Sequence, residues 1–350
     1  MSNGQNSVVI LFLLGALCFQ HAAAKPVAGC LDETGAPVDW WAALKYPHST
    51  TYSYADANNK VFSKSSYDMA SDSDGALSQT INQIYKGSKT DMAYAMYNDE
   101  SPNGDKWGTA WGHFKGVLGV ESDGGFWLVH SVPRVPETVA NGWKGYPDMA
   151  TKYGQSMLCT TLSPEEMDKV GTQMQMARGH IYDSNAPSFV KSSMPNLQAA
   201  IDGEYVHTAD SSVLQITTRG GESFTSLVKS HKWGKELYED LVAPQFQAGV
   251  YAETWQNGVG ATPSFCNNSH TFNAININHL STPEGESWKN SQDHSKWCVT
   301  MDRGVKVACI GDINRQHGQL SRGGGTLCFN DNEAIWESMI GLVTDLKKCG

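Results

Sequence analysis

The sequence lacks several features that mark common classes of protein. Its 350 residues contain no Cys-x-x-Cys pair, which argues against a cysteine-type zinc site. They contain no run of lysines or arginines and no stripe of basic and aromatic residues, so no single segment forms a conventional nucleic-acid-binding face. Beyond the first 24 residues no apolar stretch is long enough to span a bilayer, and no low-complexity linker separates two parts.

The chain opens with an apolar segment typical of a signal peptide. Residues 8–19 are apolar and are followed by His21 and three alanines, so we expect residues 1–24 to be removed by cleavage after Ala24. The segment has no lysine or arginine before it, but it is too short to span a hydrocarbon core of about 30 Å. We therefore predict a lysosomal or secreted protein without a membrane anchor.

Cysteine and asparagine positions fit a protein that passes through the oxidising secretory route. Of the eight cysteines, Cys18 leaves with the signal peptide and seven remain, an odd number that requires one unpaired or intermolecular thiol. The seven are Cys30, Cys159, Cys266, Cys298, Cys309, Cys328 and Cys349. Asn267-Asn268-Ser269 is the one glycosylation sequon, which predicts a glycoprotein.

A His-x-Lys motif occurs once in each half of the chain. The two copies occupy residues 113–115 and 294–296, and an arginine follows each histidine 21 residues later, Arg134 and Arg315. Between histidine and arginine both segments have the pattern of strand, turn, strand. The repeated spacing predicts one half of an active site used twice.

Two such motifs side by side suit the chemistry of a phosphodiester. Residues i and i+2 of a strand point to the same face, so each motif presents an imidazole and an ammonium together. One histidine can attack phosphorus and the other can protonate the leaving oxygen, while the lysines neutralise the phosphoryl oxygens. A histidine pKa near 6.5 allows both roles in mild acid, without a metal ion.

The words around these motifs resemble the deoxyribonuclease II family of the phospholipase D-like superfamily, from about Cys30 to the C-terminus. The matching segments are residues 37–41, 124–133, 293–299, 311–315 and 322–328. The resemblance implies an acid endonuclease that hydrolyses double-stranded DNA through a phosphohistidine, leaving 3′-phosphate and 5′-hydroxyl ends, with no metal or other cofactor. It assigns catalysis to His113, Lys115, His130, His294 and Lys296, and substrate binding to Asn314 and Arg315.

The resemblance also implies a fold and a disulfide pattern. The expected fold is α/β, a duplicated phospholipase D-like mixed-sheet sandwich whose pseudo-symmetric halves, residues 25–162 and 163–350, share one active site at their seam. The implied disulfides are Cys30–Cys159, Cys266–Cys349 and Cys309–Cys328, which leaves Cys298 free and buried. The oligomeric state stays open, a homodimer included.

Local patterns place the secondary structure within this plan. Strands are expected at residues 91–97, 112–120, 125–132, 250–255, 271–278, 296–300 and 305–310. Ser163 has the position of a helix N-cap, residues 224–243 have the spacing of an amphipathic helix, and residues 333–348 read as a closing helix. The glycine-rich residues 322–325 offer backbone N–H groups that can hold phosphate, although glycine is also ordinary in turns.

Overall charge and one departure from the superfamily bear on the function in opposite directions. The net charge of −10 at pH 7 repels DNA, and charging the ten histidines of the mature chain would bring it to about 0. The wider phospholipase D pattern has an aspartate seven residues after its histidine, where this chain has Val120 and Met301. The deoxyribonuclease II family also lacks this aspartate, so the departure favours a nuclease over a lipase. The alternatives to a nuclease are a phosphatidyl hydrolase of the phospholipase D type and a secreted DNA-binding or toxin-like protein without enzymatic activity.

Overall fold

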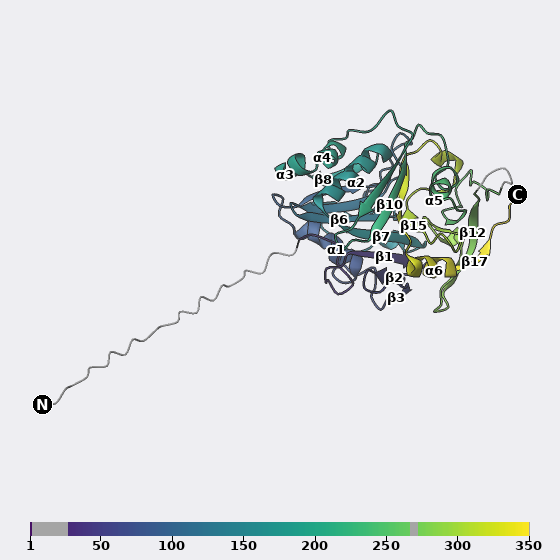
Figure 1. Ribbon diagram of the computed structural model, residues 1–350, viewed down its shortest axis with the longest axis horizontal. Coiled ribbons are helices and arrows are strands. Elements are labelled where there is room, and N and C mark those ends of the chain that lie inside the picture. Colours follow the sequence, from purple (N-terminus) through teal and green to yellow (C-terminus); the bar gives the residue numbers. More distant parts are fainter. Residues whose placement is uncertain (2–26, 267–271, 350) are drawn as a thin grey trace.

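The computed structural model describes Met1, residues 27–266 and residues 272–349 of the chain (Figure 1). Its strands are β1 Trp40–Lys45, β2 Tyr52–Asp56, β3 Ser63–Lys64, β4 Ala93–Tyr97, β5 Gly116–Glu121, β6 Gly124–His130, β7 Gln155–Leu162, β8 Ile181–Asn185, β9 Ser211–Thr217, β10 Ser223–Lys229, β11 Val250–Glu253, β12 Ala274–Ser281, β13 Ser287–Lys289, β14 Trp297–Thr300, β15 Ala308–Gly311, β16 Gly324–Phe329 and β17 Val343–Leu346. Its α-helices are α1 Ala76–Lys86, α2 Pro164–Ala177, α3 Ser188–Ser193, α4 Pro195–Ile201, α5 Ala243–Phe246 and α6 Glu333–Gly341. Short helical turns are η1 Val139–Asn141, η2 Asp148–Ala150, η3 Tyr238–Val242, η4 Asn290–Gln292 and η5 His317–Gln319.

The strands form two large sheets, and the expected duplicated α/β arrangement is confirmed. The first sheet has the order β3-β2-β1-β7-β6-β5-β4-β8, and the second has the order β13-β12-β11-β14-β15-β16-β10-β9, with β17 beside β12. In each sheet four neighbouring central strands follow the same plan, β4-β5-β6-β7 in the first and β11-β14-β15-β16 in the second. The division into halves at residue 162 stays a prediction; β8, which follows that position, joins the first sheet.

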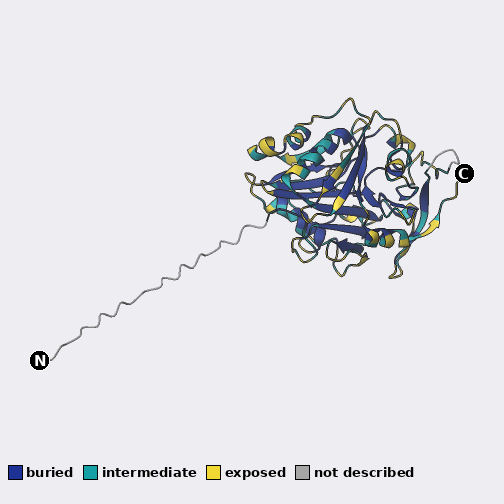
Figure 2. Cartoon of the chain, in the orientation of Figure 1, coloured by how far each residue is buried: buried dark blue, intermediate teal, exposed yellow. Residues whose placement is uncertain are grey.

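Large apolar side chains from both sheets fill one shared core. Trp40 of β1 meets Phe329 of β16 edge to face with ring centroids 4.9 Å apart, and Trp127 and Trp297 are buried in the same cluster. Such aromatic residues supply much of the apolar area that a core removes from water. The central strands are accordingly buried while exposed residues lie on loops and outer helices (Figure 2). This shared core fixes the two sheets against each other.

The local signals in the sequence were confirmed in part. The hydroxyl of Ser163 accepts a hydrogen bond from the backbone N–H of Glu166 and caps α2, as expected. The hairpin turn between β5 and β6 also lies where it was predicted, at residues 122–123. The helix expected over residues 224–243 is wrong: its first part is strand β10, paired on both sides with β9 and β16, and a helical turn begins only at Tyr238.

The closing helix is shorter than expected. The helix α6 ends at Gly341, and the residues after it form β17, which pairs with β12. The expected strands at residues 112–120 and 296–300 also begin later, at Gly116 and Trp297, so each His-x-Lys motif lies in the extended segment that leads into a strand.

The disulfide pattern is confirmed. Cys30 pairs with Cys159, Cys266 with Cys349, and Cys309 with Cys328, while Cys298 is free and buried. Burial raises the pKa of the Cys298 thiol, which keeps it in the unreactive protonated form. We therefore expect Cys298 to be a packing residue of β14.

Two findings concern only the described residues. No helix among them is long and apolar enough to cross a membrane. In the same part of the chain no cluster of three or more histidine, cysteine, aspartate or glutamate side chains has the arrangement of a metal site. The predicted signal peptide, residues 1–24, and the sequon at residues 267–269 lie outside the described residues.

Candidate active site

Each His-x-Lys motif is bonded to the opposite half of the chain. The backbone N–H of His113, ahead of β5, donates to the carbonyl of Gly323, 2.8 Å away and ahead of β16. The backbone N–H of His294, ahead of β14, donates over the same distance to the carbonyl of Gly154, ahead of β7. The two copies of the motif therefore lie at the seam between the sheets, and each is hydrogen-bonded to the segment that leads into a strand of the other sheet.

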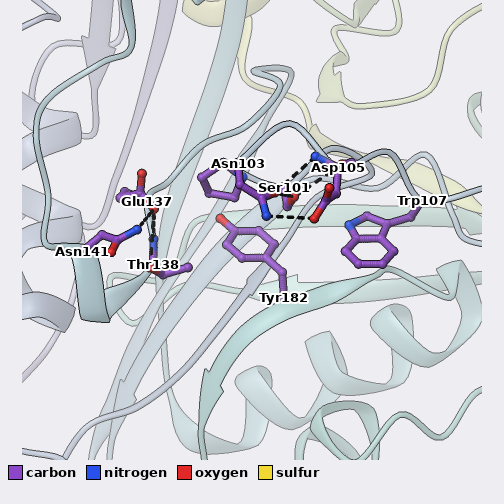
Figure 3. Close-up of a pocket in the computed structure, with 9 residues that line it drawn as sticks. Ser101, Asn103, Asp105, Trp107, Glu137, Thr138, Asn141 and Tyr182 are labelled. Atoms are coloured by element: carbon purple, nitrogen blue, oxygen red, sulfur yellow. Dashed lines mark hydrogen bonds between the residues drawn. The ribbon is translucent and has the colours of Figure 1, made fainter.

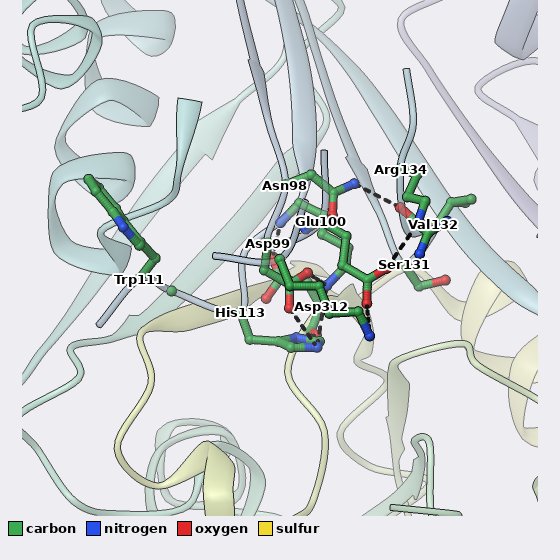
Figure 4. A network of polar contacts seen from close by, with 12 residues as sticks. Asn98, Asp99, Glu100, Trp111, His113, Ser131, Val132, Arg134 and Asp312 are labelled. Atoms are coloured by element: carbon green, nitrogen blue, oxygen red, sulfur yellow. Dashed lines mark hydrogen bonds and ion pairs between the residues drawn. The ribbon is translucent and has the colours of Figure 1, made fainter. Parts of the chain in front are cut away.

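The ring of His113 is held by the second half. Its Nδ1 contacts the carbonyl oxygen of Asp312, which can only accept, so Nδ1 carries the proton. The other ring nitrogen, Nε2, lies 3.3 Å from Nζ of Lys115. Figure 4 shows the His113 ring beside Asp312. His113 therefore has the unprotonated Nε2 that a nucleophile needs, beside an ammonium that can bind a phosphoryl oxygen.

The carboxylate of Asp312 supports the same strand. It accepts hydrogen bonds from the backbone N–H groups of Lys115 and Gly325, at 3.2 and 3.0 Å. Burial raises the pKa of Asp312 to about 7, although both N–H groups and Lys115 favour its charged form. The Asp312 side chain therefore links the two halves of the chain next to His113, the predicted nucleophile.

The ring of His294 is held by the first half in the corresponding way. Its Nδ1 lies 3.1 Å from the carbonyl oxygen of Ser131 and 3.3 Å from Oε1 of Gln155. The hydroxyl of Ser131 donates to Oε1 of Gln155 over 2.6 Å, which fixes the amide. Nζ of Lys296 lies 2.9 Å from the same ring nitrogen. These three contacts occupy Nδ1 and leave Nε2 of His294 as the atom available to exchange a proton with a ligand.

The four motif side chains share one electrostatic environment. Burial, followed by Lys296, Lys115 and His113, holds the pKa of His294 well below its usual value. Burial and the neighbouring Lys115 do the same for His113, and Lys296 adds to the effect. The pKa of Lys296 is also well below its usual value, because of burial and Lys115. The pKa values of His113, His294 and Lys296 are thus each lowered by a charge of the other motif, as expected for a single site.

Asp99 is a site residue that the sequence did not indicate. Its carboxylate lies 2.6 Å from Nζ of Lys115, 3.2 Å from Nη1 of Arg322 and 3.7 Å from Nε2 of His113. Burial raises the pKa of Asp99, but these cations outweigh it and hold the pKa well below its usual value. Asp99 sits among the groups that would bind a phosphate (Figure 4). It follows β4 in a loop with no motif, so only the fold reveals it.

His130 lies at the end of β6, close to Lys115. Its Nδ1 accepts a hydrogen bond of 3.2 Å from the backbone N–H of Val132, and its Nε2 is buried without a partner in the described structure. Burial and the charge of Lys115 lower the pKa of His130 to about 3. His130 is therefore neutral near pH 5, and because its Nδ1 accepts a hydrogen bond, its Nε2 carries the proton and can donate one.

The two residues predicted to bind substrate differ in their surroundings. Asn314 is buried, and its Oδ1 has no partner among the described residues. Arg315 is fully enclosed, and its guanidinium donates to Asn276, Glu236, Glu239 and the carbonyl of Pro263. The structure therefore places Arg315 within an internal ion-pair network and not in contact with the two histidines.

We expect Arg315→Met to unfold more easily, because it leaves the buried carboxylate of Glu236 without its cation. Breaking one partner of a buried ion pair typically costs about 3 to 5 kcal/mol. Urea denaturation measures the loss, and Arg303→Gln, at an exposed arginine, is the matched control. An Arg315→Met protein as stable as the wild type would show that the network does not stabilise the fold.

The glycine-rich residues 322–325 serve close packing. Gly324 has a φ of 150°, and a Cβ there would lie 2.6 Å from the carbonyl oxygen of His113. The carbonyl of Gly323 and the N–H of Gly325 are already bonded to His113 and Asp312. This segment positions the His113 strand, and these groups are not free to hold phosphate.

A separate cavity of about 330 Å³ lies beside the loop after β4. Its walls include Ser101, Asn103, Asp105, Trp107, Glu137, Thr138, Asn141 and Tyr182 (Figure 3). The carboxylates of Asp105 and Glu137 make it a poor place for an anion, and neither motif histidine lines it.

Comparison with known proteins agrees with this geometry. The family model for deoxyribonuclease II matches residues 29–349. The chain is 34% identical to plancitoxin-1 of Acanthaster planci, over 98% of this chain and 99% of that protein. It is 32% identical to deoxyribonuclease-2-alpha of Mus musculus, over 96% and 97% of the two chains, and 32% identical to deoxyribonuclease-2 of Caenorhabditis elegans, over 95% and 96%. The chain therefore belongs to the deoxyribonuclease II family.

Proposed function

We propose that this protein is an acid, metal-independent endonuclease that hydrolyses double-stranded DNA to 3′-phosphate and 5′-hydroxyl ends. The observation that carries the proposal is the pair of His-Lys motifs at one seam, each held by the other half of the chain. The family, and relatives named as deoxyribonucleases, support DNA as the substrate.

In the first step, Nε2 of His113 attacks phosphorus and the bond from phosphorus to the 5′ oxygen breaks. The departing oxygen takes a proton from Nε2 of His294, so a phosphohistidine and a 5′-hydroxyl form. The protonated Nδ1 of His113, held on the carbonyl of Asp312, supports His113 as the nucleophile. The reverse assignment of the two histidines is the alternative.

In the second step, His294 accepts a proton from water, and the water oxygen attacks the phosphohistidine. The bond between phosphorus and His113 breaks, which releases the 3′-phosphate and restores the starting protonation of His294. The two lysines and Arg322 neutralise the phosphoryl oxygens throughout, in a buried site where charge interactions are stronger than in water. No step requires a metal ion.

One experiment separates the nuclease from the two alternatives, a phosphatidyl hydrolase and a DNA-binding protein without enzymatic activity. The purified protein is incubated with supercoiled plasmid, and separately with phosphatidylcholine vesicles, at pH 5 in excess EDTA. The proposal predicts plasmid cleavage whose products a polymerase extends only after phosphatase treatment, since the 3′ ends carry phosphate. Release of choline instead would favour the phospholipid hydrolase, and DNA binding without cleavage would favour the non-enzymatic protein.

The compartment follows from the same reasoning. An enzyme that needs a protonated histidine works best in an acidic vesicle, and three disulfides require an oxidising route. We therefore place the protein in lysosomes or outside the cell, as a glycoprotein whose residues 1–24 are a cleaved signal peptide. Its abundance in the lysosomal fraction and in the medium, together with N-terminal sequencing, tests this placement.

A further inference from the structure

Protonation of histidines alone changes the net charge less than the sequence implies. Burial lowers the pKa of five described histidines, His113, His130, His180, His231 and His294. These histidines bind protons only at lower pH than the free side chain does, so the shift from −10 to about 0 is too large an expectation for mild acid. DNA binding therefore depends less on the net charge of the protein and more on where its lysine and arginine side chains cluster on the surface.

Cations and aromatic rings gather on one surface that no single segment encodes. We call it the cationic strip and define it by Trp107, Trp111, Arg178, His180, Tyr205 and Lys232. Trp107 and His180 stack with ring centroids 3.9 Å apart, and Trp111 meets His180 edge to face at 5.0 Å. The guanidinium of Arg178 lies 5.2 Å from the Trp111 ring and 4.1 Å from the Tyr205 ring.

Arg178 is a cation whose charge is not paired. It follows α2 in a left-handed conformation with φ of 55°, and it is half-buried between the two rings. Within the described residues its side chain forms neither an ion pair nor a hydrogen bond, and its Nε is buried without a partner. Glu204 lines the same small hollow but forms no ion pair with Arg178 in the described structure. Arg178 is thus oriented by the rings and free to bind an anion.

The strip is continuous with the active site. The backbone carbonyl of Arg178 accepts a hydrogen bond of 2.8 Å from Gly112, the residue before His113. Arg322 donates to the carbonyls of Trp111 and Gly112 while it pairs with Asp99. In Figure 4 the Trp111 side chain lies on the same segment as His113 and points away from the site. A polyanion bound at the histidines would therefore leave the site beside Arg178.

The far end of the strip carries further basic groups. Nζ of Lys232, an exposed residue, donates to the carbonyl of His207 over 3.2 Å. The His207 ring lies 4.3 Å from Tyr205, and burial, followed by the charges of Arg178 and Lys232, lowers the pKa of His231. Positive charge therefore extends from Arg322 at the active site to Arg178 and Lys232.

We propose that the cationic strip binds the sugar-phosphate backbone of the DNA that flanks the scissile phosphate. Cations on a protein surface bind the phosphates of duplex DNA without reading its sequence, and here the rings of Trp111 and Tyr205 hold the guanidinium of Arg178 in place. The proposal rests on DNA being the substrate, as proposed above, and adds the path that the substrate takes. It concerns binding and leaves the chemical step to the histidines.

The test measures DNA affinity in an inactive background. The affinity of a fluorescein-labelled 20-base-pair duplex is measured by anisotropy at pH 5 in EDTA, across salt concentrations, with His113→Asn protein. Adding Arg178→Gln and Lys232→Gln is expected to weaken binding about 10-fold and to lower the slope of log affinity against log salt by about 2, one for each lost phosphate contact. The single variants should each show about half of the change in slope.

The matched control carries Lys86→Gln and Lys89→Gln, which remove the same charge. Both lysines are exposed and lie before β4, at the end of that strand opposite Asp99, so binding should hardly change. A loss in this control as large as in the strip variant would show an effect of net charge and overturn the proposal. So would a duplex affinity and salt slope unchanged in the strip variant.

A small substrate separates the strip from the active site. With His113 intact, the strip variant should hydrolyse bis(4-nitrophenyl) phosphate at the wild-type rate, because that molecule is too short to reach the strip. A rate that falls as much as DNA cleavage would mean that Arg178 acts by positioning Gly112, which contradicts the proposal. If the protein binds DNA through the strip but never cleaves it, the proposed function fails and the strip stands.

Discussion

Replacing either motif histidine by alanine should lower DNA cleavage by roughly 10²- to 10⁴-fold, the usual contribution of a positioned acid or base. His113→Ala removes the attacking Nε2, and His294→Ala removes the proton donor, so each variant loses a group that the same transition state needs. Because the two act as a unit, the double variant should be little worse than either single one.

Single-turnover cleavage of a labelled duplex measures these losses. His279→Ala is the control, because His279 bonds to Thr344 at the edge of β12, and it should cleave at the wild-type rate. If His113→Ala and His294→Ala each kept more than a tenth of wild-type activity while remaining folded, the two-histidine mechanism would be wrong. Trapping a phosphohistidine, which is acid-labile and alkali-stable, on only one of the two histidines would also establish which is the nucleophile.

The lysines should have the second largest effect. Lys115→Gln or Lys296→Gln is expected to lower kcat by about 10²- to 10³-fold, comparable to the loss of one oxyanion donor. Each ammonium is almost fully buried beside its histidine, so water cannot replace it as a charge near phosphate. Binding of an anionic phosphate would also favour the charged form of Lys296, whose pKa is held low in the free protein.

Single-turnover rates, with thermal unfolding as a check on the fold, test the lysine prediction. Lys289→Gln is the control, since this exposed lysine lies outside the site. A folded Lys296→Gln protein that cleaves at the wild-type rate would mean that the second motif is structural and that the site is not duplicated in function.

The duplicated motifs could be predicted because their signal is local. Each His-x-Lys is a three-residue motif with a fixed distance to a later arginine, and the two copies lie directly ahead of the corresponding strands β5 and β14. The same spacing does not predict the surroundings of Arg315, whose side chain is enclosed by two carboxylates that lie far away in the sequence. Spacing locates a residue along a strand, but it does not determine what surrounds the side chain.

The groups that orient the motifs could not be predicted in this way. Asp99, Ser131, Gln155 and Asp312 follow or begin strands and carry no periodic signal, and only the packing of two sheets brings them to the histidines. Residues 224–243 failed for a different reason. Apolar residues three and four apart fit an amphipathic helix, but β10 is an inner strand, paired with β9 and β16 and buried on both faces, where apolar residues need not alternate.

The pH dependence of single-turnover cleavage in excess EDTA tests the central claim most directly. One histidine must be neutral and the other protonated, so the rate should follow a bell-shaped curve. Burial and the lysines lower the pKa of both histidines, so the proton donor is charged only below the usual histidine range. We therefore expect an optimum at about pH 4.5 to 5.5, with activity falling as pH rises toward 7.5. An optimum above pH 7, or cleavage that requires added magnesium, would contradict a metal-independent site built from two histidines.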